Sequence, residues 1–408
     1  MFKFSKIALR NLFRNKRRTL ITLSILIFGS SALIITQGFM ATMFEGARES
    51  AILQGIGHIQ VYHPDFLDKE ENKPLEFGLK DYLALQELLE KEPHIGAVEA
   101  RVEFIGLVSN GEKSVAFMGN AGQPELQQKM KMLTKVETGN DLLTAAQPNP
   151  AILGTGLAKS LNARVGDTLT LLSTTTSGAI NGIDITVAGI FTTGFKEADA
   201  RLLNVRLDTA QRLMDTGHVT KLVIGLDKTE NTGLVETQLA RLFREKKLRL
   251  TTRNWTELSL VYKQVTTTFN VIFVFLGLVI FILVVLSSSN TMMMTVFERF
   301  QEIGTLMALG TKRRWILRLF LLEGLFMGAL GGALGALFSY SFGTLLNRAK
   351  IMVPPAPGTT MGFPISVQHL PAVYLGVFVL AIFMMVAASL LPALRGARMK
   401  IVDALGHI

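Results

Sequence analysis

The chain has 408 residues, of which 49% are hydrophobic and 18% charged, with a net charge of +10 and no cysteine. Soluble domains usually carry about 25% charged residues, so this chain is too apolar to be wholly exposed to water. The lack of cysteine excludes disulfide scaffolds, Cys-ligated zinc, iron–sulfur clusters and a cysteine nucleophile. A basic excess of this size fits nucleic acid, an acidic membrane surface or membrane topology, so its distribution along the chain decides its meaning.

Four long segments contain no Asp, Glu, Lys or Arg: residues 19–44, 264–297, 324–347 and 351–394. A helix needs about 20 apolar residues to cross a bilayer. We therefore expect transmembrane helices near 19–42, 268–292, 316–346 and 371–394. A cleaved signal peptide is the alternative for the first segment. Its 26 uncharged residues exceed the usual length of about 7–15, and no A-x-A site follows, so we expect an uncleaved anchor.

Basic residues gather in three segments, namely 1–18, 293–315 and 395–408, which together hold 14 basic and 3 acidic residues. Segment 43–267 holds 25 basic and 28 acidic residues. Because Lys and Arg concentrate on the cytoplasmic side of membrane proteins, we expect the three basic segments to be cytoplasmic. Segment 43–267 and the loop 347–370 are then extracytoplasmic. The basic excess is a topology signal, and it gives no support to nucleic-acid binding.

Segment 43–267 is long enough to fold as one or two α+β domains. Alternating apolar residues predict strands, and helical spacing predicts two helices. The strands are 58–62, 167–172, 183–191, 221–226 and 248–252; the helices are 81–91 and 231–247, the second capped by Asn231 or Thr232. Asn181-Gly182 is typical of a hairpin turn, which predicts an exposed hairpin over 173–182. The loop-rich stretch 121–150 predicts a subdomain break.

Motifs for catalysis or metal binding are weak. The stretch Gly304–Lys312 resembles a Walker A loop, but its Lys is displaced, no Ser or Thr follows it and no strand precedes it. His58, His63 and Asp65 lie close together in the sequence, and either a metal site or ordinary surface histidines explains them. No nucleophile motif occurs, so we expect neither a resident cofactor nor an enzyme, and a membrane-anchored enzyme is the weakest of the alternatives.

The stretch 298–324 carries the most information. Apolar Ile303, Leu306, Met307 and Leu309 follow polar residues at helical spacing, and Gly310 reads as a helix stop. This pattern predicts a short helix along the membrane, followed by a basic turn. Such a helix docks a cytoplasmic partner or only anchors the bundle. Glu323, at the end of the stretch, is costly within a membrane and is expected to pair with a basic neighbour at 312–314 or with Arg318.

These residues resemble the permease domain of the FtsX/MacB/lipoprotein-release family of ABC transporters. The matching loop residues are Glu298, Arg299, Glu302, Ile303, Gly304, Ala308, Leu309, Gly310 and Glu323. The C-terminal residues Pro392, Ala393, Gly396, Ala397, Ala404 and Leu405 are similar to the family's last helix, with Ile401 in place of a proline. The opening 8–19 also resembles the family's amphipathic start. One span, a large domain and three more spans match the family layout over the whole chain.

The resemblance implies four transmembrane α-helices, one and then three, with a large α+β extracytoplasmic domain between helices 1 and 2. It implies a second permease copy or paralogue and two copies of an ABC ATPase subunit, which holds the ATP and Mg. The loop helix would couple to that ATPase through Glu298, Arg299, Glu302, Ile303, Leu306 and Gly310. ATP-driven closure would then move the outer domain by mechanotransmission.

Three further residue groups carry expectations. Gly324, Gly328 and Gly332 repeat every four residues and predict close helix packing, with or without motion. An adaptable lining for a lipophilic substrate is expected of Phe39, Met40, Met43, Phe44, Phe269 and Phe273; ordinary lipid-facing side chains are the alternative. A hairpin that binds a periplasmic lipoprotein carrier is expected at Thr174, Thr175, Thr176, Asn181 and Gly182.

Stretches 57–66 and 192–214 are similar to lipoprotein-release members of the family. The sequence therefore predicts a bacterial inner-membrane permease that acts on a lipidated or lipophilic envelope substrate and contacts membrane lipids. A MacB-like efflux permease of a tripartite system is the first alternative. An FtsX-like regulator of cell-wall hydrolases, which transports nothing, is the second.

Overall fold

The computed structural model describes residues 10, 16–69, 77–131, 135–355, 358–360 and 362–399. By contacts the chain forms two compact units. The helical unit comprises residues 1–45, 265–353 and 364–408, and the inserted unit comprises residues 46–264 and 354–363. Most of the predicted N-terminal segment 1–18 and the tail positions Ile401, Ala404 and Leu405 lie outside the described residues.

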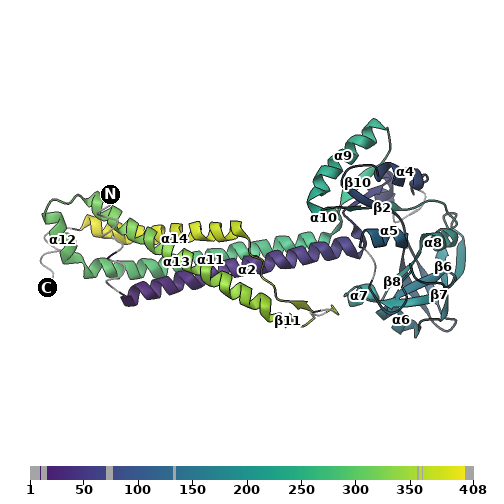
Figure 1. Ribbon diagram of the computed structural model, residues 1–408, viewed down its shortest axis with the longest axis horizontal. Coiled ribbons are helices and arrows are strands. Elements are labelled where there is room, and N and C mark those ends of the chain that lie inside the picture. Colours follow the sequence, from purple (N-terminus) through teal and green to yellow (C-terminus); the bar gives the residue numbers. More distant parts are fainter. Residues whose placement is uncertain are drawn as a thin grey trace. The chain divides into compact units, whose positions relative to one another are not determined.

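Among its described residues, the helical unit contains four long helices and one short one, which can be followed in Figure 1. They are α2 (Lys16–Ala51), α11 (Leu260–Glu298), α12 (Phe300–Ala308), α13 (Arg313–Ala349) and α14 (Pro371–Arg398). The four long helices are long and apolar enough to cross a membrane. One precedes the inserted unit and three follow its main part, which confirms the predicted fold class. The α2 and α11 helices both extend beyond the predicted spans, into residues of the inserted unit.

Glycines set the close approach of α13 to its neighbours. A Cβ atom added to Gly328 would lie 2.7 Å from the Cα atom of Ile382, so α13 and α14 touch backbone to backbone there. Gly324 and Gly332 lie along the same contact with α14. On another face of α13, Gly331 packs against Leu26 of α2. Small residues at a spacing of four thus place α13 between two helices, as helix packing in membranes favours.

The inserted unit is built on a ten-stranded sheet with the order β10-β1-β9-β2-β3-β8-β5-β7-β4, in which β6 pairs with β2 and β7. The strands are β1 (Ile59–Tyr62), β2 (Ile95–Ser109), β3 (Ser114–Gly122), β4 (Val136–Gly139), β5 (Pro150–Gly154), β6 (Thr168–Thr174), β7 (Ile180–Phe191), β8 (Leu202–Arg206), β9 (Lys221–Leu226) and β10 (Thr251–Asn254). Two short strands, β11 (Met352–Val353) and β12 (Phe363–Pro364), flank the loop that returns to this unit.

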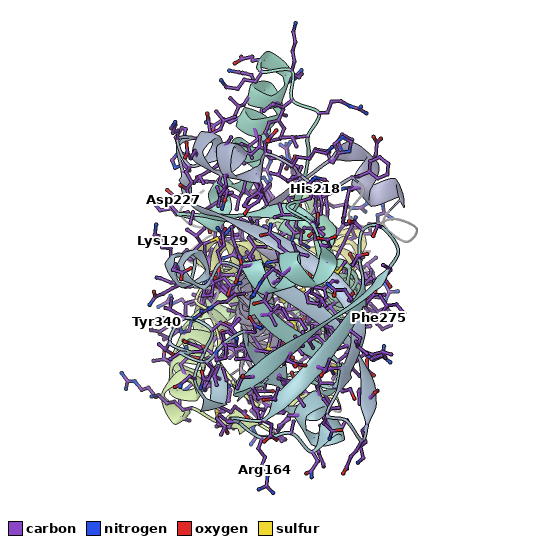
Figure 2. The ribbon with its side chains drawn as sticks, turned by 90° about the vertical axis from the view of Figure 1, so that its right-hand side faces the viewer. Lys129, Arg164, His218, Asp227, Phe275 and Tyr340 are labelled. Atoms are coloured by element: carbon purple, nitrogen blue, oxygen red, sulfur yellow. The ribbon has the colours of Figure 1, made fainter. Side chains whose placement is uncertain are left out.

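The helices of the inserted unit are short. They are α3 (Pro64–Lys69), α4 (Tyr82–Leu89), α5 (Pro124–Lys129), α6 (Thr155–Leu161), α7 (Lys196–Asp199), α8 (Leu207–Met214), α9 (Thr232–Glu245) and α10 (Trp255–Leu258). A π-helical turn at Ile52–Ile56 follows α2. Arg164, in the turn between α6 and β6, points away from the ribbon into solvent (Figure 2).

Strand β2 joins the two halves of the sheet. Its first part, up to Arg101, pairs with β9, and its second part, from Val102, pairs with β3. The predicted subdomain break over 121–150 is therefore wrong: that stretch contains α5 and β4, and residues 46–264 form one unit. Strands β2 and β3 form the centre of the sheet, but they are not among the predicted strands.

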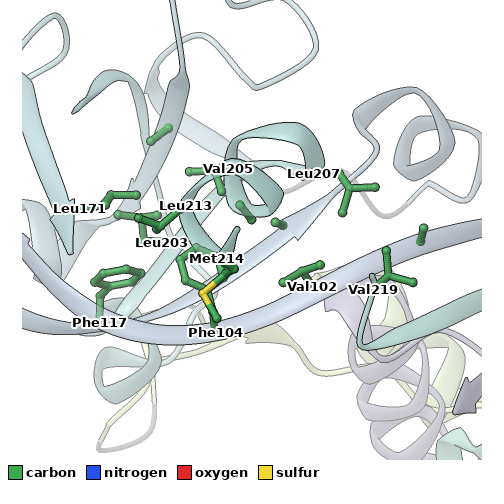
Figure 3. Close-up of a cluster of buried hydrophobic side chains, with 14 of the residues drawn as sticks. Val102, Phe104, Phe117, Leu171, Leu203, Val205, Leu207, Leu213, Met214 and Val219 are labelled. Atoms are coloured by element: carbon green, nitrogen blue, oxygen red, sulfur yellow. The ribbon is translucent and has the colours of Figure 1, made fainter. Parts of the chain in front are cut away.

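Alternation along β2 places Val102 and Phe104 on the apolar face of the sheet. There they pack with Phe117 and with Leu213 and Met214 of α8 (Figure 3). The rings of Phe104 and Phe117 meet edge to face at 5.6 Å. Burying one such side chain contributes about 1.5–3 kcal/mol. This part of the core therefore lies between the sheet and α8, and the intervening side chains of β2 face the other way.

The β6–β7 hairpin turns earlier than predicted. The turn covers residues 175–179, with Gly178 at a φ of 87°, a conformation that glycine adopts without strain. Asn181 lies in β7 opposite Ser173, so the Asn-Gly pair is part of a strand and not the turn. The Asn181 amide instead donates to the backbone oxygen of Leu213 at 3.0 Å, which ties the hairpin to α8.

Candidate functional site

The α12 helix is a separate short helix because the chain breaks at both of its ends. Arg299 has non-helical backbone angles between α11 and α12. Gly310 has a φ of 92°, and the backbone N–H of Thr311 donates to Leu306 O at 3.0 Å. A left-handed residue after the last turn stops a helix, and glycine pays no steric cost there. Gly310 thus ends α12 where the sequence placed the stop.

An ion pair fixes the start of α12. Arg299 Nη1 lies 3.0 Å from Glu323 Oε1 of α13, and its Nε donates to Glu302 Oε2 at 3.2 Å. Glu323 is only 4% exposed, so its charge needs this partner. The predicted pairing of Glu323 with a basic residue at 312–314 or with Arg318 is wrong. Arg318 instead lies over the ring of Trp315, at 4.9 Å.

The two faces of α12 differ in what they contact. Ile303 and Met307 are buried and pack against Ile316 and Phe320 of α13. The opposite face exposes Glu302, together with 43% of Leu306 and 80% of Leu309. The buried face therefore anchors α12 to the bundle, and the exposed face is an apolar surface with an acidic edge.

The six predicted coupling residues divide between these faces. Glu302, Leu306 and Gly310 lie on the exposed side, as does Glu298 at the end of α11. Ile303 points inward, and Arg299 is mostly occupied by its two carboxylates. Leu309 was not among the six, although it is the most exposed apolar side chain on this turn. Its spacing of three from Leu306 was the signal that identifies it.

Three of the six predicted lining residues come together. The ring of Phe269 lies 6.3 Å from that of Phe44 and 6.2 Å from that of Phe273. Phe39, Met40 and Met43 are half-buried on α2. A groove of about 660 Å³ lies between α2, α11 and α14, and Phe273 is the only predicted lining residue that borders it. Its walls are apolar except for Gln37 and Asn270.

The predicted carrier hairpin is exposed only in part. Thr174 and Thr176 are exposed, but Thr175 is 9% exposed, and the backbone of Thr176 donates to Met214 O at 3.1 Å. Gly182 is exposed within β7. The hairpin is therefore fastened to α8 along its length.

The histidines near β1 have structural partners. His58 Nδ1 accepts the backbone N–H of Leu226 at 3.1 Å, and burial lowers the pKa of His58 despite the opposing charge of Glu49. His63 Nδ1 lies 3.7 Å from Asp65. No group of three metal-ligating side chains occurs among the described residues.

Two family models match the chain: the MacB-like periplasmic core domain over residues 19–242 and the FtsX-like permease C-terminal region over residues 272–401. A macrolide export ATP-binding/permease protein MacB from Sodalis glossinidius is 26% identical over 98% of this chain, but the chain spans only 59% of that relative. The lipoprotein-releasing system transmembrane protein LolC from Xylella fastidiosa is 26% identical over 78% of this chain and 79% of its own length.

Among solved structures, the periplasmic region of MacB from Actinobacillus actinomycetemcomitans covers 52% of this chain and 94% of that region, with 13% identity and a TM-score of 0.36. Together the two family models cover most of the inserted unit and most of the three long helices that follow it. The chain belongs to the family of MacB-like periplasmic core domains joined to an FtsX-like permease region.

Proposed function

We propose that this chain is the permease subunit of an ABC transporter, and that the exposed face of α12 docks a separate ATPase subunit. The observation that carries the proposal is the division of α12 into two faces. Ile303, Met307 and the Arg299–Glu323 pair hold the helix to α13, while Leu306 and Leu309 remain exposed. A partner that pushes on the exposed face therefore moves α13 as well. ATP and Mg would be bound by the partner.

In this proposal the chain lies in a bacterial inner membrane with α12 and both termini in the cytoplasm. The basic turn Lys312–Arg314 beside α12 supports this orientation, because Lys and Arg favour the cytoplasmic side. The inserted unit is then periplasmic.

In this proposal, movement of the helices reaches the inserted unit through the segments of chain that connect the two units. Two of these links, α2 and α11, are single helices of 36 and 39 residues. The loop between α13 and α14 supplies another. Within the inserted unit, the Thr360 N–H donates to Gly194 O at 2.8 Å, and the Lys196 N–H donates to Gly358 O at 2.9 Å. A stroke at α12 thus has several covalent routes to the domain that meets the substrate.

A second permease copy or paralogue would complete the transporter. The exposed side of α11 supports this, because Val274 and Phe275 are 74% and 64% exposed on a helix with few buried residues. Apolar side chains on such a helix face lipid or another helix.

For the substrate we propose a lipidated or lipophilic envelope molecule, gripped by the apolar groove beside Phe273. Support comes from the LolC relative, which is matched over most of its length and is named for lipoprotein release. The MacB relative, named for macrolide export and matched over 98% of this chain, supports efflux as a second candidate. The β6–β7 hairpin would contact a periplasmic carrier in the first case.

Docking is tested by purifying the tagged full chain from its own host in mild detergent and identifying the retained proteins by mass spectrometry. We expect an ATPase with a Walker A sequence, and we expect it to be lost from the variant Leu306→Asp/Leu309→Asp. The matched control is Leu83→Asp, since Leu83 is 60% exposed on α4 of the inserted unit. Equal retention by the wild type and the α12 variant would refute docking at this face.

Substrate class is tested with a photo-reactive amino acid at position 273 and, separately, at position 345. Leu345 is also an exposed apolar residue, on α13 and outside the groove. Crosslinking of a triacylated lipoprotein at 273 only would support lipoprotein release. Crosslinking of a macrolide at 273 and not of the lipoprotein would support efflux, and equal crosslinking at both positions would reject the groove.

A further inference from the structure

The sheet of the inserted unit has a polar face that is only partly buried. Because successive side chains of a strand alternate, Glu99, Arg101 and Glu103 of β2 lie opposite the apolar face formed by Val102 and Phe104. Cross-strand register adds neighbours from three strands on the same side: Arg101 faces Lys221, and Glu103 faces Asn120, which in turn faces Asn204. Glu99 and Arg101 are 0% and 2% exposed, and Lys221 is 6% exposed.

The charges on this face are mutually paired: Glu99, Arg101 and Lys221 are buried, and the side chain of Glu103 is 45% exposed. Arg101 Nη2 lies 2.5 Å from Glu99 Oε2, and Lys221 Nζ lies 2.6 Å from Glu103 Oε1. Glu99 Oε1 also accepts Gln127 Nε2 at 2.5 Å. Burying ion pairs costs desolvation energy that an apolar face of the same shape avoids. A polar network of this size therefore calls for a role beyond stability.

A cavity of about 630 Å³ lies over this polar face. Arg101, Glu103, Asn120 and Lys221 line it on the sheet side. Further polar side chains, such as Gln60 and Thr192, also line it, and one part of the wall is apolar, formed by Leu53, Ile56, Phe191, Leu202 and Leu258. Its volume falls in the usual range of ligand pockets, about 300–1,000 Å³, and its lining combines apolar side chains with convergent polar ones.

Two polar atoms of the lining have no hydrogen-bond partner among the described residues. They are Nε of Arg101, which is a donor, and Oδ1 of Asn120, which is an acceptor. Buried polar atoms are nearly always paired, so each of them is suited to a ligand atom of the opposite kind. A ligand for this cavity thus needs an acceptor for the guanidinium and a hydroxyl or amine donor for the amide.

The charge of the cavity selects an anion. The inner ion pairs cancel one another, and the two further charged residues of the lining, Lys131 and Lys135, are both basic and exposed. Their ammonium groups attract an anionic head, and the guanidinium binds its oxygens in directed hydrogen bonds.

We propose that this cavity binds an anionic phosphate ester that bears a hydroxyl group and an apolar stem, the chemistry of a phosphatidylglycerol-like lipid head. Arg101 and the two lysines hold the phosphate, Asn120 accepts the hydroxyl, and the apolar wall takes the start of the stem. The site lies wholly within the inserted unit and does not require an ATPase. A failure of this proposal therefore leaves the docking proposal for α12 unaffected.

The test is isothermal titration of the detergent-solubilised full chain with monomeric, short-chain lipids. Dihexanoyl-phosphatidylglycerol is expected to bind saturably, and dihexanoyl-phosphatidylcholine at least about tenfold more weakly, because its head carries a positive charge and no hydroxyl. Glycerol 3-phosphate, which lacks the stem, distinguishes the source. If it binds as tightly as the lipid, the site takes a soluble phosphate ester; if it binds more weakly, the site takes a lipid. Both results support the anionic head.

Two variants locate the binding. Lys131→Glu/Lys135→Glu reverses the charge at exposed positions, and Asn120→Asp puts a like charge beside the phosphate at almost constant shape. Each is expected to weaken binding at least about tenfold. Lys113→Glu/Lys159→Glu makes the same change of net charge at exposed positions away from the cavity and is expected to leave binding unchanged. No saturable binding, equal affinity for the two lipids, or equal loss in the control variant would overturn the proposal.

Discussion

Arg299 and Glu323 form an ion pair, with 3.0 Å between Nη1 and Oε1, that joins the start of α12 to the third long helix. The two residues are 24 positions apart in sequence. Because Arg299 also binds Glu302, its guanidinium links a carboxylate of α12 to a carboxylate of α13. In the proposed function, this is the contact that makes α12 and α13 move together.

We expect Arg299→Gln to destabilise the purified full chain, because it removes the 3.0 Å ion pair with the buried carboxylate of Glu323. Glu323→Gln should destabilise the chain less, because Arg299 still forms its ion pair with Glu302. The double variant should be more stable than Arg299→Gln alone. Thermal unfolding in detergent measures all three. Strictly additive effects of the two single changes would show that the pair is not coupled.

Gly328→Ala should destabilise the helical unit by about 1–3 kcal/mol, the usual cost of overpacking. The new methyl group would lie 2.7 Å from Ile382 Cα, and backbone cannot move aside as a side chain can. Gly376→Ala in α14 is the control, because nothing lies within 4 Å of its Cβ position. The control should be neutral or slightly stabilising, as alanine favours helices. Equal shifts of Tm for both variants would contradict close packing at Gly328.

The spans and α12 could be predicted because their signals are local. Long uncharged stretches leave a helix across the membrane as the main choice, and Gly310 marks a stop that its φ of 92° explains. Gly324, Gly328 and Gly332 were chosen by spacing alone, and they lie along the contact with α14. In each case a few neighbouring residues carry the information.

Strands β2 and β3 were missed because their pattern depends on distant partners. Glu99, Arg101 and Glu103 alternate with apolar residues, which is typical of an exposed, charged stretch, but Glu99 and Arg101 form a buried ion pair. The hairpin turn was misplaced because Asn181-Gly182 has strong turn chemistry, yet Asn181 bonds to α8 and Gly178 makes the turn. The partner of Glu323 was missed for the same reason, since Arg299 comes from another helix.

Lowering the pH should destabilise the inserted unit, because it protonates Glu103. Burial alone would raise the pKa of Glu103, but the ammonium of Lys221 at 2.6 Å, with Arg101, outweighs it and holds the pKa below its ordinary value of 4.5. A depressed carboxyl pKa stabilises the fold above the unfolded pKa, and this contribution is lost as the pH falls through the folded pKa. We therefore expect Tm to fall as the pH drops below 4.5.

Glu103→Gln should be less stable than the wild type at neutral pH and should show a shallower fall of Tm in acid. Glu112→Gln, at an exposed position in the β2–β3 turn, is the matched control and should follow the wild type. Parallel curves for the wild type and Glu103→Gln would contradict the assignment.

Asp199 should stabilise segment 192–195, which hydrogen-bonds to residues 358–360. It is 1% exposed and accepts Thr192 Oγ1 at 2.6 Å and the Thr193 N–H at 2.7 Å. Asp199→Asn replaces one acceptor oxygen by a donor, so hydrogen exchange should become faster at 192–195 and at 358–360. Asp208→Asn is the control, because the Asp208 side chain is 68% exposed. Faster exchange at 192–195 alone would show that the returning loop is held independently.

In the proposed function, ATP binding by the ATPase subunit docked on α12 moves the inserted unit. The chain has no cysteine, so Ser177→Cys in the exposed β6–β7 turn gives one spin-label site per copy. The labelled chain is reconstituted with its co-purified ATPase in nanodiscs. Double electron–electron resonance spectroscopy then measures the distance between the labels of two copies. We predict that vanadate trapping shifts this distance, and that Leu306→Asp/Leu309→Asp abolishes the shift. An unchanged distance while ATP is hydrolysed would contradict the account.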